Sequence, residues 1–194
     1  MLEEIEFEQA KVYYCRQFLS EIEADHLMLY FVNQKESFWD QQEVKLFGKI
    51  YQSPRKERLI CLDSSKNYSY SGNTLKTYPW IPELNPVLEK LSKLGYVFNA
   101  VLINFYRDGK DSNGWHADNE KELGSDPIIA SVSLGAERRF QMKSKTGNEK
   151  LTQILHHGSL FLMEQGSQLH YKHQLPKMLK LAEPRINLTF RQIY

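Results

Sequence analysis

The sequence predicts an α+β protein that is mainly β, and three observations support this class. Residues 1–96 contain two segments with helical periodicity. From residue 97 onward, short apolar segments alternate with turn residues such as Gly109, Gly135 and Gly158, a pattern typical of strands joined by tight turns. Aromatic residues, which suit pleated strands, make up 12% of the chain. Many short strands of this kind favour a β-sandwich or barrel, including the jelly-roll types.

Two helices are expected, over residues 20–34 and 82–94. In the first, Ser20 and Glu23 have the S-x-x-E spacing of a capping box, and Leu27, Tyr30 and Phe31 recur at helical spacing. In the second, apolar residues fall on one face and Gly95 follows as a stop signal. We expect both apolar faces to point toward the core; the second consists of Leu84, Val87, Leu88, Leu91 and Leu94.

The remaining chain is expected to form strands and loops. Residues 45–80 contain several turn residues, and this pattern predicts short strands and loops between the two helices. Downstream, the alternation of apolar segments and glycines predicts strands over 98–106, 128–134, 137–143, 150–156, 159–164 and 184–191.

Composition limits the class of protein and its compartment. The net charge is +1, so any binding to phosphates would need a local basic patch. No segment approaches the ~20 apolar residues of a membrane helix, and the acidic start of the chain is unlike a signal peptide. We therefore expect an intracellular protein with no membrane partner, cytoplasmic in a bacterium or nuclear in a eukaryote. Cys15 and Cys61 lie far apart and predict neither a zinc site nor a disulfide.

A candidate metal site begins at Trp115-His116-Ala117-Asp118. Residues two apart on an extended backbone point the same way, so His116 and Asp118 can face one ion. Two histidines and one carboxylate with open positions form the facial triad of non-haem Fe(II) oxygenases. The spacing alone leaves the third ligand open among His156, His157, His170 and His173.

A candidate anion site lies in the strand expected over 184–191. Its residues alternate between an apolar face (Ile186, Leu188 and Phe190) and a polar face (Arg185, Asn187, Thr189 and Arg191). On an edge strand the polar face would be solvated. Two guanidinium groups on one face would also suit a dicarboxylate. In the segment 100–106, Asn104 and Tyr106 share a face, and an Asn inside a strand indicates a specific partner.

Taken together, these motifs resemble the AlkB family of Fe(II)/2-oxoglutarate-dependent dioxygenases, in its duplex-preferring DNA-repair branch. The resemblance covers residues 45–194 and rests on Asn104-x-Tyr106, His116-x-Asp118, His173-Gln-Leu-Pro and Arg185-x5-Arg191. It implies a double-stranded β-helix (jelly-roll) core with N-terminal helices packed on one side. It also implies one domain over 1–194, with helices and a nucleotide-recognition segment in 1–96 and the catalytic core in 97–194.

The resemblance implies a cofactor set of Fe(II), 2-oxoglutarate and O2. It selects His173 as the third iron ligand, beside His116 and Asp118. It assigns Arg185 and Tyr106 to the distal carboxylate of 2-oxoglutarate, and Arg191 and Asn104 to the end beside the metal, with Thr189 lining the same pocket. The implied activity is direct-reversal repair of DNA: oxidative demethylation of N-alkylated bases of the 1-methyladenine and 3-methylcytosine type, with release of formaldehyde, succinate and CO2.

The substrate side is expected upstream of the core. Tyr70, near Tyr68, resembles the family's base-stacking aromatic residue and would act with the His116 ring; packing on the core is the alternative for this tyrosine pair. Phe47 resembles a finger that fills the gap left by a flipped base. Five basic residues around Phe47 would contact phosphates: Lys45, Lys49, Arg55, Lys56 and Arg58. The alternative is that this segment is a solvated hairpin whose Phe packs in the core.

One position departs from the family pattern. Relatives that repair duplex DNA commonly have Asp and then Glu after the H-x-D motif, whereas this chain has Asn119 and Glu120. Asn can form hydrogen bonds but lacks the charge that suits a cationic base. The expected partner is an alkylated nucleic acid, DNA rather than RNA, bound by a monomer. The alternatives are an RNA demethylase, an oxygenase acting on a protein or small molecule, and a jelly-roll binding module that has lost its metal.

Overall fold

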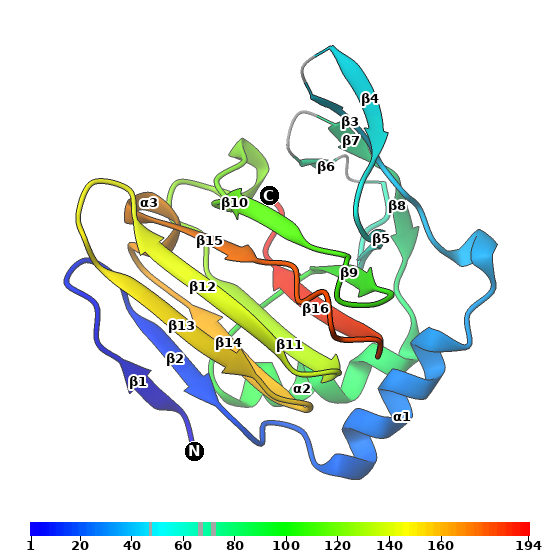
Figure 1. Cartoon of the computed structure of the whole chain (residues 1–194). Coiled ribbons are helices and arrows are strands. Elements are labelled where there is room, and N and C mark those ends of the chain that lie inside the picture. The colour runs from blue at the N-terminus through cyan, green and yellow to red at the C-terminus, as the bar shows by residue number, and fades with distance from the viewer. Residues whose placement is uncertain (47, 66–67, 71–72) are drawn as a thin grey trace.

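The computed structural model (Figure 1) describes residues 1–46, 48–65, 68–70 and 73–194. Two sheets form the body. The larger has the strand order β1-β2-β14-β11-β16-β9-β5-β8, and the smaller has the order β10-β15-β12-β13. Pairing is antiparallel throughout both sheets except between β5 and β8. This pair of sheets confirms the prediction of a mainly β, jelly-roll core.

The strands of the larger sheet are β1 (Glu3–Ile5), β2 (Val12–Cys15), β5 (Lys56–Cys61), β8 (Thr77–Pro79), β9 (Ala100–Tyr106), β11 (Ile129–Gly135), β14 (Ser159–Met163) and β16 (Arg185–Arg191). Those of the smaller sheet are β10 (Asn113–His116), β12 (Arg138–Ser144), β13 (Lys150–Leu155) and β15 (Tyr171–Leu175). Two hairpins add β3 (Glu43–Leu46) with β4 (Lys49–Gln52), and β6 (Tyr68–Tyr70) with β7 (Asn73–Leu75).

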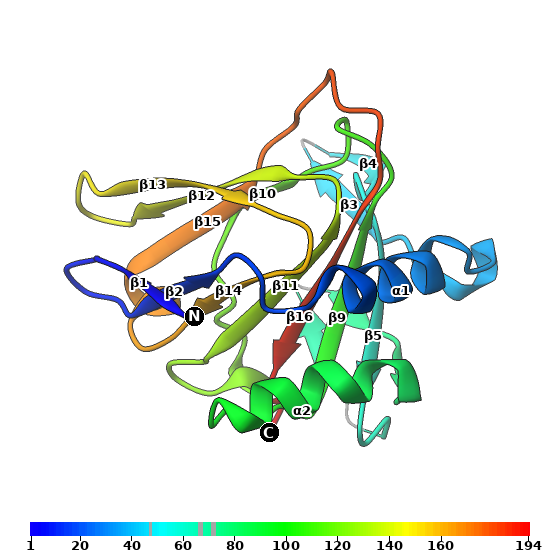
Figure 2. The same cartoon turned by 90° about the horizontal axis from the view of Figure 1, so that it is seen from below.

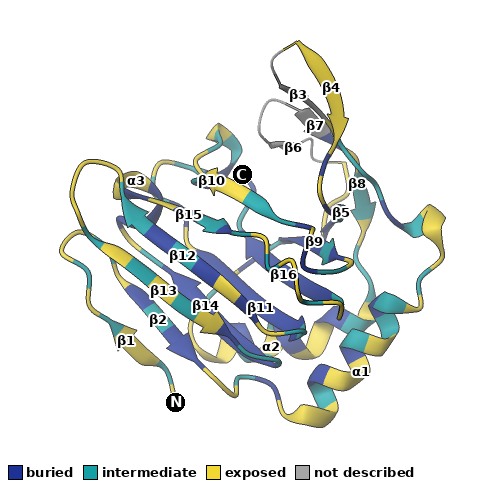
Figure 3. Cartoon of the chain, viewed as in Figure 1, coloured by how far each residue is buried: buried dark blue, intermediate teal, exposed yellow. Residues whose placement is uncertain are grey.

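Helices α1 (Glu21–Val32) and α2 (Asn85–Lys93) lie on one face of the larger sheet, as Figure 2 shows, and the smaller sheet covers the other face. A first apolar cluster joins the helices to the sheet through residues such as Phe31, Leu91 and Leu188. A second cluster fills the space between the sheets with residues such as Leu102, Phe161 and Met142. The larger sheet is therefore covered on both faces, and its central strands appear buried in Figure 3. The short helical segments α3 (Ser167–His170), η1 (Glu36–Phe38), η2 (Pro82–Leu84) and η3 (Lys121–Leu123) complete the structure.

The first helix begins where the capping box predicted. Ser20 Oγ accepts a hydrogen bond from the Glu23 amide, and the Glu23 carboxylate accepts one from the Ser20 amide. The second helix begins with the 3₁₀ segment Pro82–Leu84, and Leu94 is 43% exposed. The expectation that Leu94 faces the core was therefore wrong, because the helix ends at Lys93 and Gly95 turns the chain away with φ +93°.

Four strands were not predicted: β1, β2, β10 and β15. β2 extends the larger sheet through pairing with β14, about 145 residues away in the chain, and β1 pairs with β2 at the edge of the sheet. The pairing of β2 with β14 leaves no local pattern in the sequence. No strand was expected between residues 164 and 184, but Tyr171–Leu175 forms β15. Strand β16 is also not an edge strand, because it pairs with β9 and β11. Among the described residues, no helix combines the length and the apolar character needed to cross a membrane.

Candidate active site

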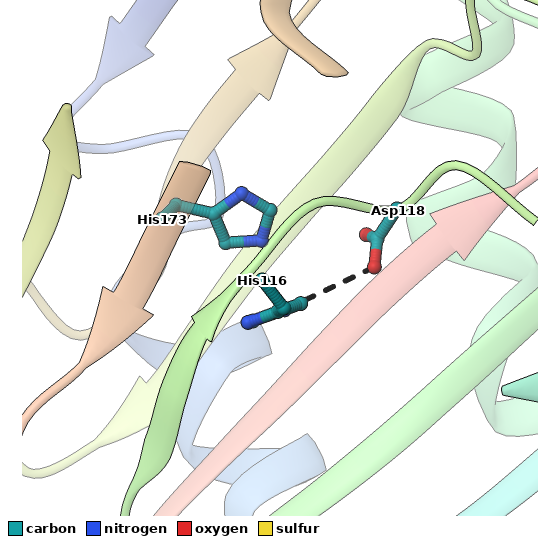
Figure 4. A group of neighbouring side chains, drawn as sticks. All are labelled: His116, Asp118 and His173. Carbon is teal, nitrogen blue, oxygen red and sulfur yellow. Dashed lines mark ion pairs between the residues drawn. The ribbon is translucent and has the colours of Figure 1, made fainter. Parts of the chain in front are cut away.

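The strand arrangement brings His116, Asp118 and His173 together (Figure 4). His116 ends β10 and faces His173 on β15 in the strand register, and Asp118 follows two residues later. One ligand atom from each residue lies within 4.8 Å of the others. The other candidates lie elsewhere: His170 is exposed at the end of α3, while His156 and His157 contact Tyr14 and Asp25. The fold therefore places His173, rather than His170, at the site.

The hydrogen bonds of His116 determine its tautomer. Its Nδ1 lies 2.7 Å from the carbonyl oxygen of Gly114, which can only accept, so Nδ1 carries the proton. Nε2 is then unprotonated and available to a metal. The His173 ring packs against Phe140, and burial lowers the pKa of His173 to about 3. Burial also lowers the pKa of His116, so both imidazoles are neutral at pH 7, as a metal site requires.

Asp118 is almost fully buried and is held from two directions. Its backbone N–H donates to Gln168 Oε1 at 2.9 Å, and Arg191 Nη2 lies 3.1 Å from its Oδ2. Burial alone would raise the pKa of Asp118, but Arg191 and the two histidines lower it below its usual value. Within the described part of the chain, Oδ1 has no hydrogen-bond partner. A buried, ionised oxygen of this kind between two neutral imidazoles fits a divalent metal ion.

A cavity extends from this cluster between the two sheets. Its floor is the polar face of β16, which carries Arg185, Asn187, Thr189 and Arg191, and β9 adds Asn104 and Tyr106. The polar face predicted from the alternation of residues 184–191 is therefore not solvated at a sheet edge. It forms the inner wall of a cavity.

Arg185 lies in the cavity with part of its hydrogen-bonding capacity unused. Nη2 donates to Ser133 Oγ at 2.9 Å, and the guanidinium carbon lies 5.2 Å from the centre of the Tyr106 ring. Among the described residues, Nε and Nη1 have no hydrogen-bond partner. Burial lowers the pKa of Arg185 to about 10, so the group still carries its charge at pH 7. A buried cation with two unused donors fits the carboxylate of an anionic ligand.

Other polar groups of the wall are hydrogen-bonded to one another. Thr189 Oγ1 donates to Asn187 Oδ1 at 3.0 Å, and Asn187 Nδ2 donates to Ser131 Oγ at 2.8 Å. Asn104 Oδ1 accepts a hydrogen bond from Arg55 Nε at 2.8 Å. These bonds fix the polar side chains before any ligand enters.

The residues expected on the substrate side lie in different places. Lys49 is exposed on β4, Asn119 is exposed, and Glu120 is half-buried. Arg55 is only 7% exposed, and its side chain donates to Asn104 in the cavity wall, so it does not belong to a surface patch. Phe47 lies outside the described residues, as do the side chains of Lys45, Tyr68 and Tyr70. The other two members of the expected basic stretch have partners: Lys56 pairs with Glu36, and Arg58 lies over the rings of Phe38 and Tyr78.

Two further residues of the site were missed from the sequence. Gln168, fully buried in α3, holds the backbone of Asp118. Asn113 lines the cavity, and its Nδ2 lies 3.3 Å from His116 Nε2. Neither residue carries a recognisable motif. A signal for Asn113 was its place three residues before a suspected ligand, whereas Gln168 stands among other polar residues and carried no signal.

Comparison with known proteins agrees with this geometry. A family model described as the 2OG-Fe(II) oxygenase superfamily matches residues 11–191. The chain is 42% identical over 159 residues to the DNA oxidative demethylase ALKBH2 of Homo sapiens, covering 77% of this chain and 60% of that protein. It is 41% identical over 138 residues to the alpha-ketoglutarate-dependent dioxygenase alkB homolog 3 of Mus musculus, covering 66% of this chain and 48% of that protein.

A solved structure, that of OsALKBH1, covers 96% of this chain and 100% of its own chain with a TM-score of 0.64. Its sequence identity is 16%, so this likeness concerns the fold alone. The chain belongs to the 2OG-Fe(II) oxygenase superfamily and, within it, to the AlkB family. It spans about half to three-fifths of the length of the curated relatives described above.

Proposed function

We propose that this protein is an Fe(II)- and 2-oxoglutarate-dependent dioxygenase that removes methyl groups from N-alkylated bases in DNA. The observation that carries the proposal is the pairing of two features in one cavity. A buried His116–Asp118–His173 cluster lies at one end, and Arg185 offers two unused N–H donors in the same cavity. The names of the relatives, DNA oxidative demethylase and alpha-ketoglutarate-dependent dioxygenase, support the same chemistry.

In this proposal, His116, Asp118 and His173 hold Fe(II). Arg185 and Tyr106 hold the distal carboxylate of 2-oxoglutarate, and Arg191 and Asn104 lie at the end beside the metal. When bound, the iron and 2-oxoglutarate supply the oxidising chemistry that activates O2. The protein keeps both histidines neutral and Asp118 ionised, and it orients the cosubstrate with side chains that are already fixed.

The overall reaction converts one methylated base, one 2-oxoglutarate and one O2 into one hydroxymethyl base, one succinate and one CO2. One oxygen atom enters succinate and the other enters the methyl carbon. The hydroxymethyl group then leaves as formaldehyde, with release of one proton when the methylated base was a cation. Because a base inside a duplex cannot reach a site between two sheets, the target base must be flipped out or lie in a single strand.

For the substrate side we propose that Tyr70 and the His116 ring stack on the flipped base, with Tyr68, Asn119 and Glu120 around it. Phe47 would fill the gap in the duplex, and Lys49 would contact the phosphates. We further propose a monomeric, intracellular protein. RNA is the second candidate substrate, because Asn119 replaces an acidic residue of the duplex-repair pattern and weakens the charge match to a cationic base.

One panel of substrates tests this function. Methylated single-stranded DNA, duplex DNA and RNA are incubated with Fe(II), 2-oxoglutarate and O2, and formaldehyde is measured. We expect release from DNA and its loss in Asp118→Ala. Full turnover by Asp118→Ala would refute the metal assignment. Release from none of the three nucleic acids, with 2-oxoglutarate still bound, would refute the substrate. A loss in Phe47→Ala that is equal on duplex and single strands would contradict the finger.

A further inference from the structure

One guanidinium group, that of Arg55, links the two sheets beside the His116–Asp118–His173 cluster. Arg55 lies just before β5 of the larger sheet. Its Nε donates to Asn104 Oδ1 on β9 at 2.8 Å, and its Nη1 donates to Asn113 Oδ1 on β10 of the smaller sheet at 3.2 Å. The backbones are tied at the same place, since the Ser112 amide donates to the Pro54 carbonyl at 2.9 Å. Arg55 thus links two asparagines that approach the cavity from opposite sheets.

A buried carboxylate accompanies this guanidinium group. Glu57 on β5 is 2% exposed and faces Asn104 in the strand register. Its Oε2 lies 3.3 Å from Arg55 Nη2, at the distance of an ion pair rather than of an aligned hydrogen bond. Desolvation of both groups offsets much of the attraction in such a pair. The main effect of the Arg55–Glu57 pair is therefore to fix the direction in which the Arg55 guanidinium points.

The chemistry of Arg55 determines how both amides are turned. A guanidinium group can only donate, so Asn104 and Asn113 must present their oxygens to it. Their NH2 groups are therefore the ends that can donate into the cavity, which both residues line. Asn113 Nδ2 already lies 3.3 Å from His116 Nε2, the nitrogen left unprotonated by the bond to Gly114. Once Nε2 ligates a metal, it no longer accepts from Asn113.

We propose that Arg55, oriented by Glu57, is a positioning residue that turns the NH2 groups of Asn104 and Asn113 toward the cavity, and that Asn113 is a further contact for the carboxylate of 2-oxoglutarate beside His116. The inference rests on the proposed function, because it takes 2-oxoglutarate as the occupant. It adds Asn113 and Glu57 to the residues that determine cosubstrate affinity. Without the link, either amide could rotate and present its oxygen, which would repel the carboxylate.

Direct binding tests the proposal without turnover. The full chain is loaded with Mn(II) and titrated calorimetrically with 2-oxoglutarate. Asn113→Asp keeps the acceptor for Arg55 and the side-chain volume but removes the NH2 group. Loss of a hydrogen bond to a charged group predicts an increase in Kd on the order of 10- to 100-fold. Glu57→Gln should raise Kd several-fold, whereas the control Glu36→Gln, the same change at an exposed residue of η1, should leave it unchanged.

The outcomes separate the two proposals. Wild-type protein that binds Mn(II) but no 2-oxoglutarate would overturn the proposed function and this inference with it. Wild-type binding together with an Asn113→Asp Kd within twofold would overturn the inference alone. So would a Glu57→Gln variant that melts at a lower temperature but keeps its Kd, because Glu57 would then be structural. If Asn113→Asp does not fold or weakens Mn(II) binding, Asn113→Ala gives the same readout without an added charge, and an unchanged Kd there counts against the inference.

Discussion

Replacement of Arg185 by Met should weaken 2-oxoglutarate binding and stabilise the unliganded protein at the same time. On the binding side, Nε and Nη1 are buried donors without partners among the described residues. Each charge-assisted hydrogen bond to a carboxylate contributes about 1.5–3 kcal/mol. Two such bonds amount to about 3–6 kcal/mol, which corresponds to a loss of affinity on the order of 10²- to 10⁴-fold.

On the stability side, burial lowers the pKa of Arg185 from its usual value to about 10. For a base, a lowered pKa means that the folded state disfavours the charged form. The cost is fully present below pH 10 and shrinks as the pH rises above 10. The lowered pKa corresponds to a cost of about 3 kcal/mol at neutral pH. Met removes this cost and also the bond to Ser133, about 1 kcal/mol, so a net gain of about 2 kcal/mol is expected at pH 7.

Two measurements on one variant check this reasoning. Calorimetric titration of the Mn(II)-loaded protein gives the Kd for 2-oxoglutarate, and thermal unfolding without ligand gives stability. Arg139→Met is the matched control, because Arg139 lies exposed on the outer side of β12. A Kd of Arg185→Met within threefold of wild type would refute the assignment of the carboxylate site. A drop in melting temperature by several degrees would refute the account of the buried charge.

Three further predictions concern other parts of the molecule. Gly109→Ala should lower the melting temperature by several degrees, because the alanine Cβ would lie 1.9 Å from the Met178 carbonyl oxygen. An unchanged melting temperature would show that the Met178 backbone can move away at no cost in stability. Ser20→Ala should cost about 1 kcal/mol in chemical denaturation without altering turnover, since it removes the capping box; a change in turnover would contradict this separation. On Mn(II) binding at pH 6.5, two ordinary histidines would together release about one proton. Because burial lowers the pKa values of His116 and His173, we expect a smaller release; calorimetry in buffers of different ionisation enthalpy measures it, and a release of about one proton would contradict the lowered pKa values.

The sequence predicted elements whose signals are local. The capping box at Ser20 located α1, and the alternation of residues 184–191 identified which side chains of β16 share a face. It could not show that β16 is a central strand, because its position in the sheet depends on pairing with β9 and β11. The same alternation is present in β15, where Tyr171, His173 and Leu175 are buried, but this strand was not predicted, because three of its five residues (Lys172, His173 and Gln174) are polar.

The candidate site was also predicted only as far as local sequence signals reach. The spacing of His116 and Asp118 suggested a metal site, yet the choice among the downstream histidines needed the strand register that places His173 opposite His116. Arg55 is a residue whose location the sequence predicted wrongly. Counting charges along residues 45–58 suggested a surface patch, but a linear count contains no information on side-chain direction, and Arg55 turns inward.

The two-sided burial of β16 also predicts how a systematic mutational scan of this strand would look. Ile186, Leu188 and Phe190 pack in the cluster beneath the helices, while the residues between them line the cavity. Substitutions at alternate positions should therefore fall into two classes: those at residues facing the helices should reduce the abundance of folded protein, and those at residues lining the cavity should reduce the proposed activity at normal abundance. Neighbouring codons would differ in phenotype, and codons two apart would agree.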